Sequence, residues 1–269
     1  MSGAADQGPP APHPKPNATR VLILGGTTEA SALAALLARE TDVSVTLSLA
    51  GRTAAPRPEP VPMRVGGFGG AEGLARWLAG NGIEAVIDAT HPFAARISAN
   101  AAAACRAGGV PLLALRRPAW ERQPGDDWTE ADSVPACLDA LGPAPRRVFL
   151  TIGRQELSAF ARAPQHAYLV RTIEPVGDAL PVPNLVTVSA RGPFTLADET
   201  RFMREAGIEV LVTKNSGGAA TYPKIEAARA LGVPVVIVAR PALPDVPAVP
   251  DAAGAIRWLK TGLDRSGPA

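Results

Sequence analysis

The chain has 269 residues, a formal net charge of +2 at pH 7, two cysteines and three histidines. The small net charge argues against duplex nucleic-acid binding. Cys105 and Cys137 are far apart in the sequence, which argues against a disulfide scaffold or a cysteine metal site. The scarcity of histidine argues against a histidine cluster. No apolar run approaches the ~20 residues that span a bilayer, so we expect a cytoplasmic protein of one large or two modest domains, with no metal, nucleic-acid or membrane partner.

The first half of the chain alternates short apolar runs with alanine-rich helical patterns. Residues 1–18 contain PPAPHPKP and no apolar signal-peptide segment, so we expect a disordered tail there. Strands are predicted at residues 21–24, 43–49, 63–65, 85–87 and 111–115. Helices are predicted from Glu29, Ala71 and Ala94. This β-α-β series indicates a parallel sheet.

The second half repeats the alternation. Strands are predicted at residues 148–152, 167–171, 185–189, 210–213 and 233–239, with helices near Gln155, Leu196, Lys224 and Ala253. The polar stretch from Trp120 to Ser133 is the expected connection between the two halves. We therefore predict an α/β protein of two Rossmann-like lobes, with mostly parallel sheets and an active-site cleft between them. The predicted boundaries are a tail at 1–18, an N-terminal lobe at 19–125 and a C-terminal lobe at 126–269.

The turn after the first strand resembles a dinucleotide-binding turn. Where that motif has G-x-G-x-x-G, the sequence from Gly25 to Ala30 reads G-x-T-x-x-A, with Thr27 in place of the second glycine. Backbone N–H groups at the start of the following helix are suited to an anion such as a phosphate. We expect Gly25, Gly26, Thr27, Thr28 and Glu29 to contact a cofactor. The alternative is a partial capping box with Gly26 as the N-cap, which needs no ligand.

The second strand end bears on which dinucleotide binds. NAD-binding folds usually place an acidic residue there to hold the ribose hydroxyls. The sequence from Leu49 to Thr53 is LAGRT, which has no acid and offers Arg52 to a phosphate on the ribose. NADPH is therefore favoured over NADH. A solvated loop arginine is the equally weighted alternative.

The fourth strand runs into IDATHPFA, where the nicotinamide half of a dinucleotide would reach. Asp88 and Thr90 are expected cofactor contacts, and His91 is the candidate catalytic residue. His91 is suited to act as a general acid or a substrate hydrogen-bond donor. The alternative is a structural histidine bonded to its own turn.

Four consecutive strands of the second half end near a cation. Arginine binds carboxylates in bidentate fashion, so this repetition indicates a site for several carboxylates. The expected substrate contacts are Arg154, Arg171, Arg191, Lys214, Asn215, Ser216 and Gly217. The turn TKNSGG is also suited to grip a phosphate of the cofactor. The sequence Tyr222-Pro223-Lys224 lacks the Y-x-x-x-K spacing of short-chain dehydrogenases, and no catalytic role is expected for it.

The motifs GGTTEA, DATHPFA, IGR, SARGPF and TKNSGG, in this order, resemble the precorrin-6A reductases of cobalamin biosynthesis. The resemblance runs from Arg20 to about Pro241. It implies a cytoplasmic reductase that uses NADPH to saturate one double bond of the precorrin-6A macrocycle, giving precorrin-6B. A related branch of the family acts on the cobalt-containing ring.

This resemblance gives the second-half cations a ligand, because the tetrapyrrole carries many carboxylate arms. It assigns NADPH to residues 19–125 and the tetrapyrrole to residues 126–269, with hand-over from neighbouring pathway enzymes as a further expectation. The conjugated ring can absorb the electrons delivered with hydride, so a dedicated protein acid is dispensable. Two alternatives stay open: an NADP(H)-sensing binding protein, and a reductase of a smaller carboxylate.

Overall fold

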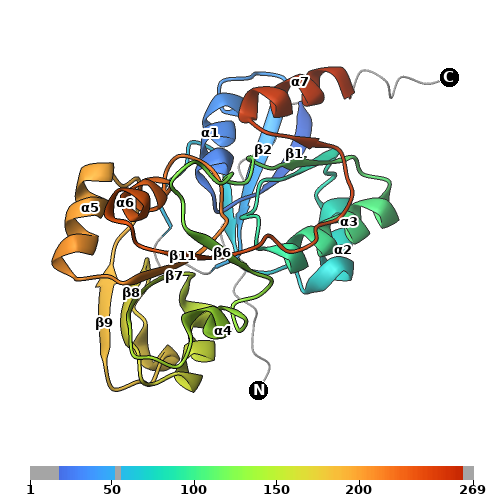
Figure 1. The fold of residues 1–269 in the computed structure, drawn as a ribbon. Helices are drawn as coiled ribbons and strands as arrows, with labels where there is room; N and C mark the ends of the chain where they lie inside the picture. The colour runs from blue at the N-terminus through green and yellow to red at the C-terminus, as the bar shows by residue number, and fades with distance from the viewer. Residues whose placement is uncertain (1–17, 52–55, 263–269) are drawn as a thin grey trace, which may run out of the picture. The chain divides into compact units, whose positions relative to one another are not determined.

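A computed structural model describes residues 18–51 and 56–262. The predicted tail therefore lies outside the described residues, apart from Ala18. The chain divides into two compact units: the first runs to Arg116 and resumes at Leu243, and the second spans Arg117–Ala242. Each unit is built on one sheet of six strands, and every strand pairing recorded is parallel (Figure 1).

The first unit has the strand order β12-β5-β4-β1-β2-β3. Its strands are β1 (Thr19–Leu24), β2 (Val43–Leu49), β3 (Met63–Val65), β4 (Ala85–Asp88), β5 (Leu112–Leu115) and β12 (Ala248–Val249). Its helices are α1 (Thr28–Leu37), α2 (Gly70–Gly80), α3 (Ala95–Gly108) and α7 (Ala252–Gly262).

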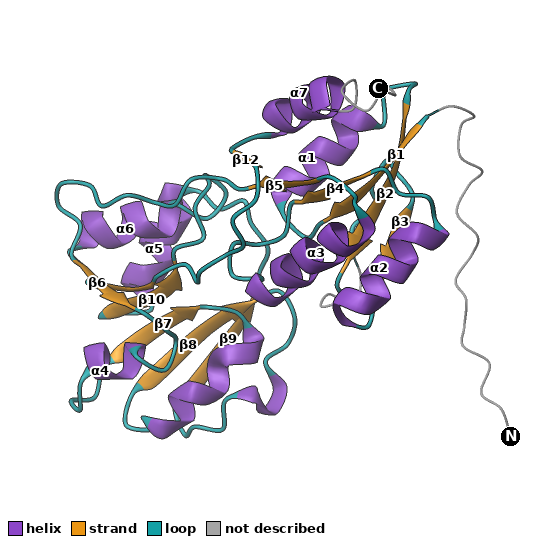
Figure 2. Ribbon diagram, turned by 90° about the vertical axis from the view of Figure 1, so that its right-hand side faces the viewer, coloured by secondary structure: helices purple, strands orange, loops and turns teal. Residues whose placement is uncertain are grey.

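Helices cover both faces of this sheet, as Figure 2 shows. Successive side chains of a strand point to opposite faces, and β1 follows this rule. Val21 and Ile23 pack in one apolar cluster with residues of α1 and α7, whereas Leu22 and Leu24 pack in another with residues of α2 and α3. A sheet buried on both faces explains why its strands read as continuous apolar runs.

The second unit has the strand order β6-β11-β10-β7-β8-β9. Its strands are β6 (Trp128–Ala131), β7 (Arg147–Thr151), β8 (Ala167–Thr172), β9 (Leu185–Ser189), β10 (Val210–Lys214) and β11 (Val235–Val238). The helices are α4 (Cys137–Leu141), α5 (Leu196–Glu205) and α6 (Pro223–Leu231), and the 3₁₀ segments are η1 (Arg154–Arg162) and η2 (Gly177–Ala179). Phe149, Met203, Leu211 and Ile225 form part of the core between the sheet, α5 and α6.

The structure confirms the predicted fold class, two α/β units with parallel sheets, and each predicted strand overlaps an observed one. The units differ from the predicted lobes at the C-terminal end, because β12 pairs with β5 and α7 packs against α1. The expected connection at 120–133 also contains a strand, β6, which pairs with β11. Among the described residues, no helix is long and apolar enough to cross a membrane.

Candidate functional site

The turn after β1 is shaped by two glycines for different reasons. A Cβ added to Gly25 would lie 2.6 Å from Cδ1 of Leu47, and the Gly25 N–H donates to the Ser48 carbonyl at 2.9 Å. Gly26 has φ +109°, which L side chains rarely adopt, and a Cβ added there would meet nothing within 4 Å. The turn is therefore tight against β2 at Gly25 and open at Gly26.

Thr27 is the N-cap of α1, so the capping interpretation that used Gly26 is wrong by one residue. The Thr27 hydroxyl accepts a hydrogen bond from the Ala30 N–H at 3.1 Å and donates to the Ala89 carbonyl at 2.8 Å. The second bond ties the turn after β1 to the end of β4. The hydroxyl is thus already used in both directions within the protein.

Backbone N–H groups, rather than the Thr27 hydroxyl, are the hydrogen-bond donors available to an anion at this turn. The N–H groups of Gly26, Thr27 and Thr28 make no recorded hydrogen bond to any residue in the described part of the chain. They lie at the start of α1, where the helix dipole favours an anion. The Thr28 hydroxyl donates to Glu29 Oε2 at 3.1 Å. Arg52, the expected phosphate contact, lies outside the described residues.

The residues that follow β4 lie beside this turn, because β1 and β4 are neighbouring strands. The buried Asp88 carboxylate accepts hydrogen bonds from the Thr90 N–H at 3.2 Å and the Thr90 hydroxyl at 2.6 Å. His91 Nδ1 accepts from the Phe93 N–H at 3.2 Å, so the proton of a neutral His91 is on Nε2. The structure therefore brings the expected cofactor contacts of β1 and β4 together, and gives His91 a structural bond within its own turn.

Arg64 on β3 was not singled out by the sequence. Its Nη1 donates to Ser48 Oγ at 2.8 Å and to the Gly66 carbonyl at 2.9 Å, and its Nη2 donates to the Gly67 carbonyl at 3.2 Å. Its guanidinium lies 3.8 Å from the ring centroid of Phe68, and burial lowers the pKa of Arg64. The glycine-rich run GGFGG directly after β3 is the signal that would have marked this position.

The second unit confirms that the four predicted cations share one edge of a sheet. β10, β7, β8 and β9 are consecutive in the sheet order, and parallel strands end at the same edge. The cations lie at or just after the carboxyl ends of these strands: Lys214 on β10, Arg154 after β7, Arg171 on β8 and Arg191 after β9. Their burial divides them into two pairs, because Arg171 and Lys214 are largely buried whereas Arg154 and Arg191 are exposed.

Arg171 forms an ion pair with a buried glutamate of the same unit. Its Nη1 and Nη2 lie 2.5 and 2.9 Å from the two carboxylate oxygens of Glu199 on α5. The two side chains are 8% and 2% exposed. The Arg171 guanidinium also lies 3.9 Å from the ring centroid of Phe194 and 4.9 Å from that of Phe149. This geometry describes a buried structural pair.

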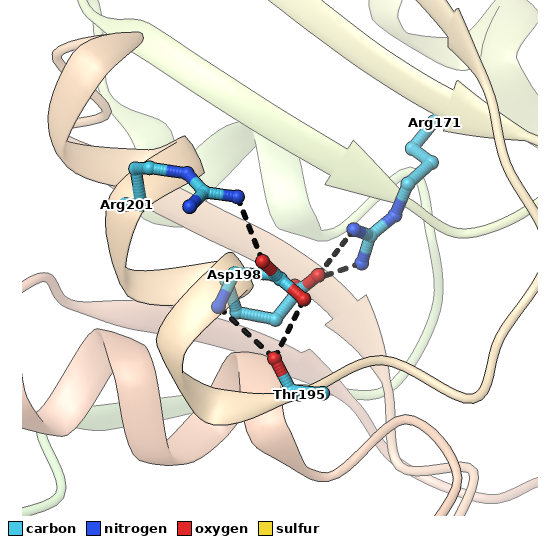
Figure 3. Close-up of polar contacts among 5 residues, drawn as sticks. Arg171, Thr195, Asp198 and Arg201 are labelled. Atoms are coloured by element: carbon cyan, nitrogen blue, oxygen red, sulfur yellow. Dashed lines mark hydrogen bonds and ion pairs between the residues drawn. The ribbon is translucent and has the colours of Figure 1, made fainter.

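The start of α5 fixes the position of Glu199. Thr195 is the N-cap, and its hydroxyl accepts from the Asp198 N–H at 3.1 Å and donates to Asp198 Oδ2 at 2.7 Å (Figure 3). Arg201 Nη2 lies 2.7 Å from Asp198 Oδ1 in an exposed pair of the same helix. These local bonds hold the first turn from which Glu199 reaches Arg171.

Of the other three cations, Arg154 and Arg191 are exposed, whereas the side chain of Lys214 is only 13% exposed. Lys214 pairs with Glu156 on η1, whose side chain is 41% exposed. Arg154 is exposed and donates to the Pro175 carbonyl at 3.4 Å, which is a weak bond. Arg191 is also exposed, in the loop between β9 and α5. Arg154 and Arg191 are therefore better placed than Arg171 to receive carboxylates from solvent.

The turn after β10 is held by the protein itself. Asn215 Oδ1 accepts from the Trp120 N–H at 2.7 Å, and Asn215 Nδ2 donates to the Trp120 carbonyl at 3.0 Å. The Ser216 carbonyl accepts from Arg117 Nε at 2.7 Å, and the buried Gly217 has φ +67°. The Asn215 amide is thus used to fasten Trp120.

Lys224, to which the sequence assigned no role, is buried in the first turn of α6 and is 4% exposed. Its Nζ lies 5.1 Å from the ring centroid of Trp120. Burial, with smaller contributions from Arg171 and Arg117, lowers the pKa of Lys224 to about 7 against the opposing effect of Glu199. A lysine directly after the N1 proline of a helix is the sequence signal for this position, since the helix dipole disfavours a cation there.

Neither cysteine has the properties of a reactive site. Burial raises the pKa of Cys105 to about 12 and that of Cys137 to about 11, so both thiols are protonated at neutral pH. Among the described residues, no group of three or more His, Cys, Asp and Glu side chains is arranged to hold a metal ion.

Comparisons with known proteins agree over nearly the whole chain. A sequence model of the family described as precorrin-6x reductase CbiJ/CobK matches residues 20–260. The precorrin-6A reductase of a Sinorhizobium species is 55% identical over 230 residues, covering 86% of this chain and 88% of its own. A solved structure of CobK precorrin-6A reductase has a TM-score of 0.86 at 49% identity, covering 90% of this chain and 96% of its own. The cobalt-precorrin-6A reductase of Salmonella typhimurium is 29% identical, covering 82% and 87%.

Proposed function

The chain belongs to the family of precorrin-6x reductases, and from this membership we propose that it reduces one double bond of precorrin-6A with NADPH, giving precorrin-6B in cobalamin biosynthesis. The observation that carries the proposal is the agreement of family, relatives and solved structure over the same residues. The enzyme is an oxidoreductase acting on a CH–CH group, with NADP as the acceptor. We also propose that it works in the cytoplasm and receives its substrate from a neighbouring enzyme of the pathway.

We propose the metal-free macrocycle as the substrate. The relatives named precorrin-6A reductase share about half of their residues with this chain, whereas those named cobalt-precorrin-6A reductase share under a third. A comparison of the two substrates under the same conditions tests this choice.

The turn after β1 is the proposed seat of the cofactor phosphates. Gly26 leaves open space there, and three backbone N–H groups at the start of α1 make no recorded hydrogen bond to the described residues. NADPH, when bound, supplies the hydride. Asp88 and Thr90 shape the neighbouring end of β4, and Arg52 keeps its expected role toward the ribose phosphate on the sequence alone.

The carboxyl edge of the second sheet is the proposed seat of the macrocycle. Arg154 and Arg191 are exposed and would bind carboxylate arms directly. Arg171 is a positioning residue, because both Nη atoms of its guanidinium already bond to the Glu199 carboxylate. Lys214 would exchange Glu156 for a substrate carboxylate, and Asn215, Ser216 and Gly217 hold the shape of the edge.

The enzyme test is an anaerobic incubation of the protein with NADPH and precorrin-6A, following the absorbance of both. We expect steady oxidation of NADPH that requires the macrocycle. An NADP(H)-sensing protein would bind NADPH without turnover. A reductase of a smaller carboxylate would turn over a simple carboxylate and leave precorrin-6A unchanged.

A further inference from the structure

The carboxyl edge of the second sheet exposes large apolar side chains as well as cations. Ile173 is the first residue after β8 and is 51% exposed, and Leu196 is the first residue of α5 and is 45% exposed. Exposed apolar residues that are scattered singly over a surface need no explanation. Ile173 and Leu196 need one, because the topology places them together.

Both residues lie at the same edge of the sheet. Every strand pairing of this sheet is parallel, so α5, which connects β9 to β10, begins at the carboxyl edge and returns along the sheet. Arg171 points from β8 toward the first turn of α5, as Figure 3 shows, and bonds to Glu199 there. Ile173 follows Arg171 by two residues toward the edge. Leu196 precedes Glu199 by three residues, on the same side of the helix and one turn nearer the edge.

Phe194 adds an aromatic ring to this surface. Its ring centroid lies 3.9 Å from the Arg171 guanidinium, and the residue is partly exposed. Its N–H donates to the Ala220 carbonyl at 3.3 Å. Ile173, Phe194 and Leu196 are called the apolar platform below.

The backbone that carries the apolar platform is held by local hydrogen bonds. The Thr172 hydroxyl donates to the Glu174 carbonyl at 2.6 Å, which closes the turn around Ile173. Thr195 caps α5 directly before Leu196. A surface that is already ordered loses little conformational entropy when a ligand covers it.

Exposed cations flank the apolar platform along the chain. Arg154 donates to the carbonyl of Pro175, two residues after Ile173, and Arg191 lies three residues before Phe194. The exposed acid in the first turn of α5, Asp198, is paired with Arg201. A small carboxylate would be bound by the arginines alone and would leave the apolar surface uncovered. A ring with apolar faces and carboxylates on its rim would use both.

We propose that the ring plane of the macrocycle lies against the apolar platform, while Arg154 and Arg191 bind carboxylate arms at its rim. The inference rests on the proposed function and adds to it the residues that contact the ring rather than its arms. It divides the affinity into two contributions. Salt screens the contacts with carboxylates, whereas it does not screen the apolar contact.

The test measures the dissociation constant of precorrin-6A under anaerobic conditions, without NADPH, for matched pairs of variants. Leu196→Gln is paired with Leu36→Gln, because both are helix leucines of similar exposure, 45% and 41%. Ile173→Thr is paired with Val186→Thr, because Val186 is 57% exposed and lies near the start of β9, away from the carboxyl edge. All four changes are at the surface, so the variants should melt at the temperature of the parent.

Leu196→Gln and Ile173→Thr should each raise the dissociation constant by about three- to tenfold, because each removes part of the apolar area that the ring covers. Leu36→Gln and Val186→Thr should bind as the parent does. Added salt should weaken binding to the parent and to Leu196→Gln in the same proportion. Arg154→Ala should lose less affinity on adding salt than the parent, which distinguishes a contact with a carboxylate from a contact with the ring.

Unchanged affinity in the double variant Ile173→Thr, Leu196→Gln would overturn the proposal, and so would equal losses in the two controls. A dimer of the parent that Leu196→Gln dissociates, detected by sedimentation, would assign the apolar platform to self-association instead.

If the parent fails to bind precorrin-6A, the proposed function fails, and the apolar platform is tested with two other ligands. Uroporphyrin is a flat ring with carboxylates on its rim, and mellitate is a benzene hexacarboxylate that lacks the large ring. Weaker binding of uroporphyrin alone by the double variant would support a site for a carboxylated ring. Equal effects on both ligands, or no binding of uroporphyrin, would exclude it.

Discussion

Thr27 was predicted to contact a phosphate, but its hydroxyl makes hydrogen bonds within the protein. Replacing Thr27 with valine removes the cap of α1 and the bond to the Ala89 carbonyl. We expect the free energy of unfolding to fall by about 1 to 2 kcal/mol, as for other lost caps. Chemical denaturation without cofactor measures this, with Thr28→Val as the control, because within the described part of the chain the Thr28 hydroxyl has one recorded bond, to Glu29 at the surface. Unchanged stability together with a tenfold loss of NADPH affinity would assign the hydroxyl to the cofactor.

Arg171 and Glu199 should behave as a buried pair. Arg171→Ala leaves the Glu199 carboxylate buried without its partner, and we expect a loss of about 3 to 5 kcal/mol in the free energy of unfolding. The double variant Arg171→Met, Glu199→Leu removes both charges and should recover most of that loss. Thermal and chemical unfolding of the three proteins measure it. A single variant as stable as the parent would show that Arg171 is free to bind substrate.

Unlike Arg171, Arg154 and Arg191 should affect substrate binding rather than stability. Alanine at either position should leave stability within about 0.5 kcal/mol, because both side chains are exposed. The KM for precorrin-6A should rise by roughly ten- to a hundredfold, since each charge-assisted bond to a carboxylate is worth about 1.5 to 3 kcal/mol. Steady-state kinetics and NADPH titration measure this. Loss of NADPH affinity with an unchanged KM would mean that the two ligands have been assigned to the wrong units.

These residues also show the limit of prediction from sequence at the site. The cations and the glycine turn were predictable, because strand ends can be read from apolar runs. The partner of Arg171 was not, since Glu199 is 28 residues away on a helix whose rotation the sequence does not give. Lys224 was overlooked because its position next to Arg171 and Trp120 depends on how α6 packs.

At the scale of elements, α7 belongs to the core of the first unit. Leu259 is 3% exposed and packs in the apolar cluster that includes α1 and β1. We expect Leu259→Ala to lower the free energy of unfolding by about 2 to 5 kcal/mol. Arg257→Ala, on the exposed side of α7, should change it little. Chemical denaturation of the two variants measures these stabilities, and a separate titration with NADPH accompanies it. Equal stability of the two variants would contradict the assignment of α7 to this core.

The strands that were predicted from the sequence are longer apolar runs, whereas those that were missed are short or contain polar residues. β1, β2 and β10 are apolar runs flanked by turns, and they were predicted to within two residues. β6 has the sequence WTEA, with only Trp128 and Ala131 buried, so its two polar residues conceal it in a charged stretch. β12 is two residues long and gains its pairing only from β5, far along the chain.

At the scale of the whole molecule, the two units carry different chemistry. The first presents backbone N–H groups at a helix start, which suits the phosphates of a dinucleotide. The second presents cations along one sheet edge, which suits a ligand with several carboxylates. The proposed function connects the two, because reduction of precorrin-6A by NADPH would need both a dinucleotide and a polycarboxylate tetrapyrrole.

The stoichiometry of the anaerobic reaction tests this account most directly. Precorrin-6A is supplied in limiting amount with NADPH, and the NADPH oxidised is compared with the precorrin-6B formed. The account predicts one NADPH oxidised per macrocycle reduced, with NADH a much poorer donor and the cobalt-containing ring a poorer substrate. An intact macrocycle after prolonged incubation with folded, NADPH-binding protein would contradict it.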